Sequence, residues 1–217
     1  MDNLNKYIEH TLLKQDAVKA DFIKLFDEAK EHGFLGVCIN PCYVKFAKEY
    51  LKDSDVKIVT VIGFPLGANT TETKIFETIN AVRDGADEID MVINVTKVKE
   101  RETDFVVNEI RQIKAACQGK NLKVIIETDL LSKDEIKYAC ECAVKGGADF
   151  VKTSTGFVKG GVGAKTEDVE LMFNTVKGAG LQVKASGGIR DKEAALAMIK
   201  SGAVRLGTSS GVKIVQG

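Results

Sequence analysis

The chain has 217 residues, enough for one large domain with a full hydrophobic core or for two small ones. Lysine and arginine together number 31, as do aspartate and glutamate, so the net charge is zero and we expect no nucleic-acid partner. No apolar run is long enough to span a membrane, and the N-terminal residues lack the apolar core of a signal peptide, so we expect a cytoplasmic protein with no membrane partner.

Strand-like and helix-like segments alternate along the chain. In chain order, the expected strands are YIEHTLL, LGVCIN, KIVTVIGF, EIDMVIN, KVIIET, FVKTS, QVKAS and VRLGTSS. Amphipathic helices are expected at 20–32, 71–84, 103–117, 132–145 and 190–200, where apolar residues recur at spacings of three and four. The helix-like segments end at regularly placed glycines: Gly33, Gly85, Gly119, Gly147, Gly180 and Gly202.

This alternation of strands and helices predicts a parallel sheet covered by helices. Eight such units in 217 residues fit a compact (β/α)8 TIM barrel, an α/β fold for which about 250 residues is typical. No linker or low-complexity tract divides the chain, so we expect one barrel domain over residues 1–217. The structural alternative is a doubly wound open sheet, but no GxGxxG motif follows the first strand to support a dinucleotide site.

Two lysines occupy strand positions where an apolar residue would be usual. Lys152 in DFVKTSTGF and Lys184 in LQVKASGG each follow a valine near the carboxyl end of a strand. If Val151 and Val183 pack against helices, both lysines point into the barrel from neighbouring strands. An ion pair with a nearby carboxylate is the structural alternative. Burial and a second positive charge both depress a lysine pKa, which would free a neutral amine to form a Schiff base with a carbonyl.

The strand in DEIDMVIN supplies two interior carboxylates, because its apolar residues alternate with Glu88 and Asp90. Asp90 is nearer the carboxyl end of the strand, where chemistry is built in such barrels, so we expect it to hold an ammonium group or to move a proton. Glu88 lies deeper and is expected to form a structural ion pair. A purely structural partnership of Asp90 with Lys184 is the alternative.

Glycine-rich turns follow the last two expected strands. ASGGI and GTSSG place backbone N–H groups and serine hydroxyls at the rim where barrels of this kind often bind phosphate. A small phosphorylated substrate is therefore expected. Metal is not expected, because two histidines are too few for a His-rich cluster and the five cysteines, which we interpret as reduced thiols, lack the paired spacing of a zinc site.

The segments EHTLL, GVCINP, TVIGFPLGANTTETK, GADEIDMVIN, IIET, ADFVKTSTGF, VKASGGIR and LGTSSG occur in the order typical of one family. Over nearly its whole length the chain resembles the deoxyribose-phosphate aldolases, which are cofactor-free, metal-independent class I aldolases on a (β/α)8 barrel. The resemblance implies reversible cleavage of 2-deoxy-D-ribose 5-phosphate, a phosphorylated sugar, to D-glyceraldehyde 3-phosphate and acetaldehyde, in deoxyribose phosphate catabolism.

Site residues follow from the same resemblance. Lys152 matches the lysine that forms the Schiff base, Lys184 the second lysine that lowers its pKa, and Asp90 the acid of the proton relay. The implied substrate-binding residues are Cys38, near the substrate pocket, and Thr155, Gly156, Gly187, Gly188, Ser209 and Ser210, on or beside the phosphate-binding loops.

Three departures from the family pattern bear on the site. Glu9 stands where the family commonly has aspartate, which would shift a water-mediated contact to the proton relay by one methylene. Asp129 replaces a glycine usual after ET, and the effect of its charge on a phosphorylated substrate depends on its direction. The chain ends at GVKIVQG without a C-terminal tyrosine that some members use in proton transfer, so that role is expected to pass to water or another group.

Two other functions fit the sequence less well. A different Schiff-base aldolase on the same barrel would act on a ketose phosphate. A barrel that binds a phosphorylated metabolite without turnover would have no need of an inward lysine on the sixth strand. The sequence leaves the oligomeric state open, with a homodimer as one alternative.

Overall fold

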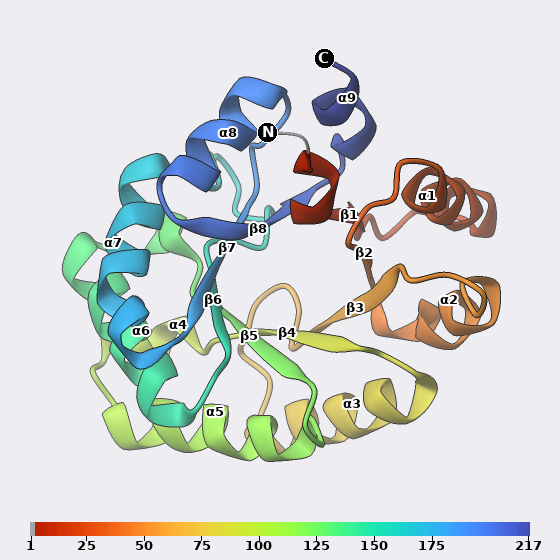
Figure 1. Cartoon of the computed structure of the whole chain (residues 1–217). Helices are drawn as coiled ribbons and strands as arrows, with labels where there is room; N and C mark the ends of the chain where they lie inside the picture. The colour runs from red at the N-terminus through yellow and green to blue at the C-terminus, as the bar shows by residue number, and fades with distance from the viewer. Residues whose placement is uncertain (1–2) are drawn as a thin grey trace.

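The computed structural model describes residues 3–217. Eight parallel strands pair in chain order, and β8 pairs back with β1 to close a barrel with helices on its outside (Figure 1). The strands are β1 (Ile8–Leu12), β2 (Gly36–Ile39), β3 (Lys57–Ile62), β4 (Glu88–Val92), β5 (Asn121–Ile125), β6 (Phe150–Lys152), β7 (Gln182–Ser186) and β8 (Ala203–Thr208). The predicted single-domain (β/α)8 barrel is confirmed, and the open-sheet alternative is wrong.

The five predicted helices are present, with ends that differ by two residues or fewer. They are α1 (Lys19–Glu31), α3 (Thr71–Asp84), α5 (Thr103–Ala116), α6 (Lys133–Gly146) and α8 (Lys192–Lys200). The structure adds α2 (Val44–Tyr50), α4 (Val95–Lys99), α7 (Thr166–Val176), α9 (Gly211–Gln216) and the 3-10 turns η1 (Leu4–Tyr7), η2 (Pro41–Tyr43), η3 (Thr128–Leu130) and η4 (Lys177–Ala179). Because α2, α4 and α9 have seven residues or fewer, they are too short to show a helical period in sequence.

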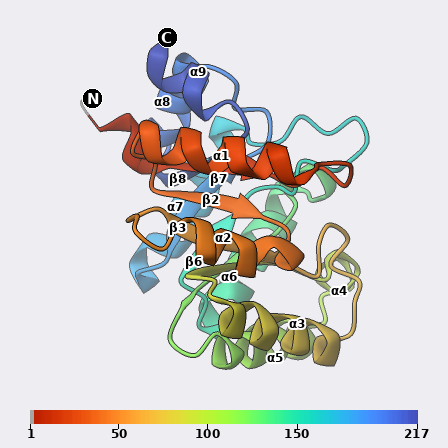
Figure 2. The same ribbon diagram turned by 90° about the vertical axis from the view of Figure 1, so that its right-hand side faces the viewer.

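Local sequence signals explain where the helices begin and end. The side chain of Ser132 accepts the N–H of Glu135, whose carboxylate in turn accepts the N–H of Ser132, so α6 begins with a capping box. The same helix ends at Gly147, which has φ 78°, a left-handed conformation that glycine adopts without strain. Figure 2 shows α1, α2 and α3 one below another on the side of the barrel that carries β2 and β3. No helix within residues 3–217 is long and apolar enough to cross a membrane.

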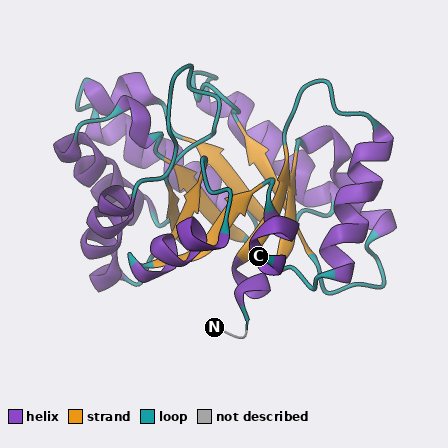
Figure 3. Cartoon of the chain, turned by 90° about the horizontal axis from the view of Figure 1, so that it is seen from above, coloured by secondary structure: helices purple, strands orange, loops and turns teal. Residues whose placement is uncertain are grey.

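The main apolar core lies between the strands and the surrounding helices. Figure 3 shows from above how the helices flank the strands. The barrel interior is different. A small apolar cluster of Leu13, Cys38, Val59 and Val61 fills the side near β2 and β3. The opposite side, near β4 to β7, holds buried charged side chains instead. Since unpaired charges are costly to bury, this half of the interior must be organised by ion pairs.

The strands end earlier than the apolar runs in the sequence suggest. β6 stops at Lys152, so Thr153 and Ser154 belong to the loop that follows. β5 stops at Ile125, and Glu127 just beyond it has φ 61°, a left-handed conformation that residues other than glycine seldom adopt. The loop after β6, at the carboxyl end of the barrel, therefore begins directly after Lys152.

Candidate active site

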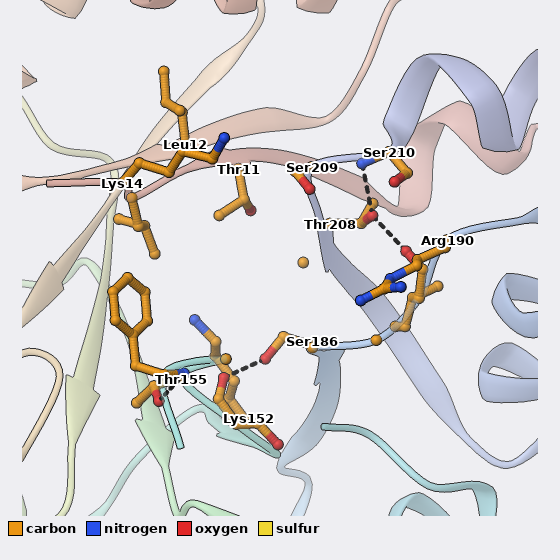
Figure 4. A pocket seen from close by; sticks show the side chains of 18 residues that line it. Thr11, Leu12, Lys14, Lys152, Thr155, Ser186, Arg190, Thr208, Ser209 and Ser210 are labelled. Atoms are coloured by element: carbon orange, nitrogen blue, oxygen red, sulfur yellow. Dashed lines mark hydrogen bonds between the residues drawn. The ribbon is translucent and has the colours of Figure 1, made fainter. Parts of the chain in front are cut away.

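Lys152 is the last residue of β6, and its side chain points into the barrel. Val151 is fully buried in the core between sheet and helices, so the alternation of the strand turns Lys152 the other way. Lys152 is only 3 % exposed, yet it lines a cavity of about 280 Å³ among the loops at the carboxyl end of the strands. Figure 4 shows its amine facing this cavity.

Asp90 joins the two lysines predicted from the sequence. Lys152 Nζ donates a hydrogen bond of 2.8 Å to Asp90 Oδ2, and Lys184 Nζ donates one of 2.6 Å to the same oxygen. Asp90 is completely buried, which by itself would raise the pKa of its carboxyl. The charges of Lys123, Lys152 and Lys184 outweigh burial and hold that pKa well below its usual range. Asp90 is therefore a carboxylate at neutral pH.

Lys184 is a permanently charged neighbour of Lys152. Burial acts to lower the pKa of Lys184, but the carboxylates of Asp90 and Glu9 overcome it and raise the pKa above its ordinary value. Lys184 Nζ donates a hydrogen bond directly to Glu9 Oε2. Glu9 thus reaches the lysine itself, and the extra methylene relative to aspartate spans the distance. Its other oxygen lies 3.7 Å from Arg205 Nε at the base of the barrel.

Glu88 forms the structural ion pair that its depth in β4 predicted. Its carboxylate lies 3.2 Å from Lys57 Nζ and 2.5 Å from Lys123 Nζ, and it accepts a hydrogen bond of 3.1 Å from Asn121. Burial would raise the pKa of Glu88, but these two lysines and the amide lower it to about 2. Glu88 does not line the cavity that Lys152 faces.

The residues predicted to bind substrate gather at one rim. The cavity is lined by Thr155, Gly156, Gly187, Gly188, Ser209 and Ser210 together with Lys152. After β8, the N–H of Ser210 donates to Thr208 Oγ1 at 2.9 Å (Figure 4). At the end of β7, Ser186 Oγ donates to the carbonyl of Ser154 at 2.6 Å. These bonds hold the turns that follow β7 and β8 in place. Gly188 cannot carry a side chain, because a Cβ there would lie 2.4 Å from the carbonyl oxygen of Val162.

Two cationic residues at this cavity were not predicted from the sequence. Lys14 follows β1 and Arg190 follows β7, and both line the cavity with exposed side chains. Within residues 3–217 neither forms an ion pair, so their charges are available to an anion. Arg190 extends toward the middle of the cavity in Figure 4. The motif VKASGGIR contained this signal, but Arg190 was assigned to the start of a helix that in fact begins at Lys192.

Cys38 lies behind the cavity and does not line it. Its side chain is fully buried in the small apolar cluster inside the barrel. Burial raises the pKa of the Cys38 thiol, although the nearby charges of Lys184 and Lys152 act to lower it. Cys38 is therefore close to the two lysines but does not line the cavity, and its predicted part in substrate binding stays a prediction.

Two acidic residues after β5 hold the neighbouring loop. The Glu127 carboxylate accepts hydrogen bonds from the backbone N–H of Thr155, at 3.2 Å, and from its hydroxyl. Asp129 Oδ2 accepts the N–H of Gly163 at 2.8 Å, which turns the carboxylate toward the loop and not into the cavity. Gly163 packs on Gly187, the first glycine of the turn after β7. Asp129 therefore supports the glycine turn from behind.

Comparison with known proteins agrees with this geometry. The family model for DeoC/LacD family aldolase matches residues 5–217. This chain belongs to the DeoC/LacD aldolase family. Two relatives called deoxyribose-phosphate aldolase come from Finegoldia magna, 57 % identical over 99 % of both chains, and from a Geobacillus species, 58 % identical over 100 % of this chain and 96 % of the other.

A solved structure supports the same family membership. The deoxyribose phosphate aldolase from Aeropyrum pernix, described as having a unique tetrameric structure, superposes on this aldolase with a TM-score of 0.91. It is 33 % identical, and the match covers 98 % of this chain and 89 % of the other. The family resemblance seen in the motifs of the sequence is thus confirmed over nearly the whole barrel.

Proposed function

We propose that this aldolase cleaves 2-deoxy-D-ribose 5-phosphate reversibly to D-glyceraldehyde 3-phosphate and acetaldehyde, in the catabolism of deoxyribose phosphate. The names of the Finegoldia and Geobacillus relatives support this substrate. One observation carries the chemistry: Lys152 faces the cavity while sharing one oxygen of Asp90 with the charged Lys184. An amine beside a second positive charge and a proton carrier is an arrangement suited to a carbon–carbon lyase that works through an imine.

Cleavage begins with the open-chain sugar. The neutral amine of Lys152 attacks C1, and loss of water gives a protonated imine. The protonated imine accepts the electron pair of the C2–C3 bond. This bond breaks while the C3 hydroxyl loses its proton and becomes the aldehyde of the product. D-Glyceraldehyde 3-phosphate leaves, and C1 and C2 remain on Lys152 as an enamine.

Release of acetaldehyde reverses the first steps. Protonation at C2 converts the enamine to an imine, which water then hydrolyses to free Lys152. Asp90 is placed to move protons with the help of water, since its Oδ2 contacts Lys152 directly. Lys184 keeps its charge throughout and disfavours a second charge on Lys152.

The phosphate group is proposed to lie at the opposite edge of the cavity from the reacting carbons. The turns at Gly187–Gly188 and Ser209–Ser210 offer backbone N–H groups and hydroxyls, and Arg190 adds a free guanidinium. Binding at that edge would hold C1 beside Lys152. A reactant held next to its catalytic group reacts faster because less entropy is lost on the way to the transition state.

Asp129 gives a specific prediction about phosphate binding. Replacing it by glycine removes the acceptor of the Gly163 N–H, so the loop no longer supports the turn at Gly187. Loss of a hydrogen bond to a charged group is worth about 1.5 kcal/mol, so we expect KM for the phosphorylated sugar to rise roughly 10-fold with little change in kcat. Steady-state kinetics of Asp129→Gly will measure this change in KM.

Asp129→Asn keeps an acceptor oxygen and is the matched control, expected to retain a KM close to that of the parent enzyme. Equal KM values in all three proteins would contradict the support role.

The substrate assignment is tested by product analysis. Incubation with 2-deoxy-D-ribose 5-phosphate should release acetaldehyde and D-glyceraldehyde 3-phosphate in equal amounts, measured with coupled dehydrogenases. Cleavage of a ketose phosphate without acetaldehyde would favour the other Schiff-base aldolase. Binding of the deoxy sugar phosphate with no product from either substrate would favour a barrel without turnover.

Chelators should leave the rate unchanged. The proposed reaction uses two amines and a carboxylate, and within residues 3–217 no group of three or more histidine, cysteine, aspartate or glutamate side chains could hold a metal ion. We therefore expect identical rates before and after prolonged EDTA treatment and dialysis. Activity that disappears with EDTA and returns with one divalent metal would rule out the metal-independent mechanism.

Two further expectations belong to this proposal. A cytoplasmic location would place the enzyme beside its phosphorylated substrate, which does not cross membranes unaided; fractionation of cells tests it. A homodimer is proposed as the assembly, whereas the Aeropyrum pernix aldolase is described as tetrameric. Light scattering coupled to gel filtration distinguishes the two.

A further inference from the structure

A third lysine is buried inside the barrel, and the proposed mechanism does not use it. Lys123 is the middle residue of β5, between Leu122 and Val124, which pack in the outer core. Strand alternation therefore turns Lys123 inward, where it is completely buried and does not line the cavity. Its pairing register places it beside Asp90 on β4.

Every anion near Lys123 belongs to the same cluster. Lys123 Nζ lies 2.5 Å from Glu88 Oε2, 3.0 Å from Asp90 Oδ1 and 3.6 Å from Glu9 Oε1. The ring of Phe150 lies 5.7 Å from the same nitrogen. Lys123 thus occupies one oxygen of Asp90, while Lys152 and Lys184 share the other. This leaves the Asp90 carboxylate a single orientation.

Two lysines of this buried cluster, Lys123 and Lys184, stay positively charged beside Lys152. Burial would lower the pKa of Lys123, but the carboxylates of Asp90 and Glu9 raise it, so Lys123 is a cation. Lys184 is a cation for the same reason. Two fixed positive charges therefore contact Asp90 whether or not Lys152 is protonated. Without Lys123, Lys184 alone would have to compensate both Asp90 and Glu9, so a positive charge on Lys152 would be favoured more strongly.

We propose that Lys123 is a positioning residue of this aldolase: its charge on Asp90 Oδ1 shifts imine formation at Lys152 to lower pH and holds Oδ2 between the two other lysines. The inference rests on the proposed Schiff base at Lys152. The titratable or charged groups around Lys152 in this cluster are Glu9 on β1, Cys38 on β2, Lys57 on β3, Glu88 and Asp90 on β4, Lys123 on β5, Glu127 after β5, Lys184 on β7 and Arg205 on β8. Of these, Lys123 and Lys184 are the cations that contact Asp90 directly.

The test measures imine formation and not only turnover. Acetaldehyde and borohydride trap the imine, and the trapping rate is followed from pH 5 to pH 10. In Lys123→Met we expect the pH of half-maximal trapping to move upward by about one unit or more, because one cation beside Asp90 is lost. A variant that folds, traps more slowly at every pH and keeps the same midpoint would overturn the proposal, since a purely structural role predicts that result.

Lys74→Met is the matched control. Lys74 is also completely buried and pairs with a buried carboxylate, Glu109, at 3.0 Å, but this pair joins α3 to α5 outside the barrel interior. Removing it should lower the thermal midpoint without moving the trapping midpoint. A shift as large as that of Lys123→Met would show that any lost buried lysine alters the profile, and the proposal would fail.

A second pair of variants decides the matter if Lys123→Met does not fold. Glu88→Gln and the double variant Glu88→Gln with Lys123→Met differ only in Lys123, and neither leaves Glu88 as an uncompensated anion. The double variant should trap with a midpoint at least half a unit above that of Glu88→Gln. Equal midpoints would overturn the proposal. Failure of the parent enzyme to be labelled at Lys152 would instead reject the proposed function.

Discussion

Replacing Lys152 by arginine should abolish cleavage of the deoxy sugar phosphate, lowering kcat by about 10⁴-fold or more, as removal of a covalent nucleophile does in other enzymes. Arginine keeps its proton at every accessible pH and cannot attack a carbonyl. The measurement is the rate of acetaldehyde release. Borohydride reduction in the presence of acetaldehyde should add two carbons to the peptide that contains Lys152 in the parent enzyme, and none to the variant.

The same labelling experiment separates the two lysines. Lys184 shares an oxygen of Asp90 with Lys152, so geometry alone allows either amine to be near a substrate. Of these two lysines, Lys152 lines the cavity and Lys184 does not. A label found on Lys184, or full activity in Lys152→Arg, would reverse the assignment.

Replacing Lys184 by leucine should lower the rate at pH 7 by about a hundredfold and restore part of it as the pH rises. The positive charge of Lys184 disfavours a proton on Lys152 and compensates Asp90. Without that charge, protonation of Lys152 becomes easier, so a higher pH is needed to free the amine. The pH profile must therefore move in the alkaline direction.

The profile of kcat and the rate of imine trapping should be measured together for Lys184→Leu. An alkaline shift in both supports the electrostatic role of Lys184. If the height of the profile falls and its position stays the same, Lys184 acts by proton transfer or by contact with substrate. The variant also removes the hydrogen bond that Lys184 donates to Glu9, so its thermal midpoint should be compared with that of Lys74→Met, which removes a buried pair elsewhere.

The sequence was sufficient to place Lys152 and Lys184 because strand alternation fixes which way a side chain points. In both strands a valine packs outward, and the next residue must then face inward. The pairing of Lys152 with Lys184 in the register between β6 and β7 follows from the same alignment. Asp90 was predictable for the same reason, since β4 alternates apolar and acidic residues.

Lys123 was not predicted to lie inside the barrel, because the start of its strand was misplaced by two residues. The apolar run KVIIET suggests that Lys123 starts the strand, a position at which a lysine can reach solvent. In the structure β5 begins two residues earlier, at Asn121, and Lys123 becomes an interior residue. The contact from Asp129 to Gly163 was not predictable either, because it depends on the path of an irregular loop and not on a repeating pattern.

The hydrogen bond between Glu9 and Lys184 joins residues 175 positions apart in the chain. It connects β1 to β7, so it can form only after the last strands have been synthesised and have closed the barrel. Before closure the interior carboxylates face water and lack this partner, and Lys152 lacks the neighbours that prepare it for attack. Recovery of aldolase activity during refolding should therefore coincide with barrel closure, which makes the enzyme's own reaction a reporter of its final folding step.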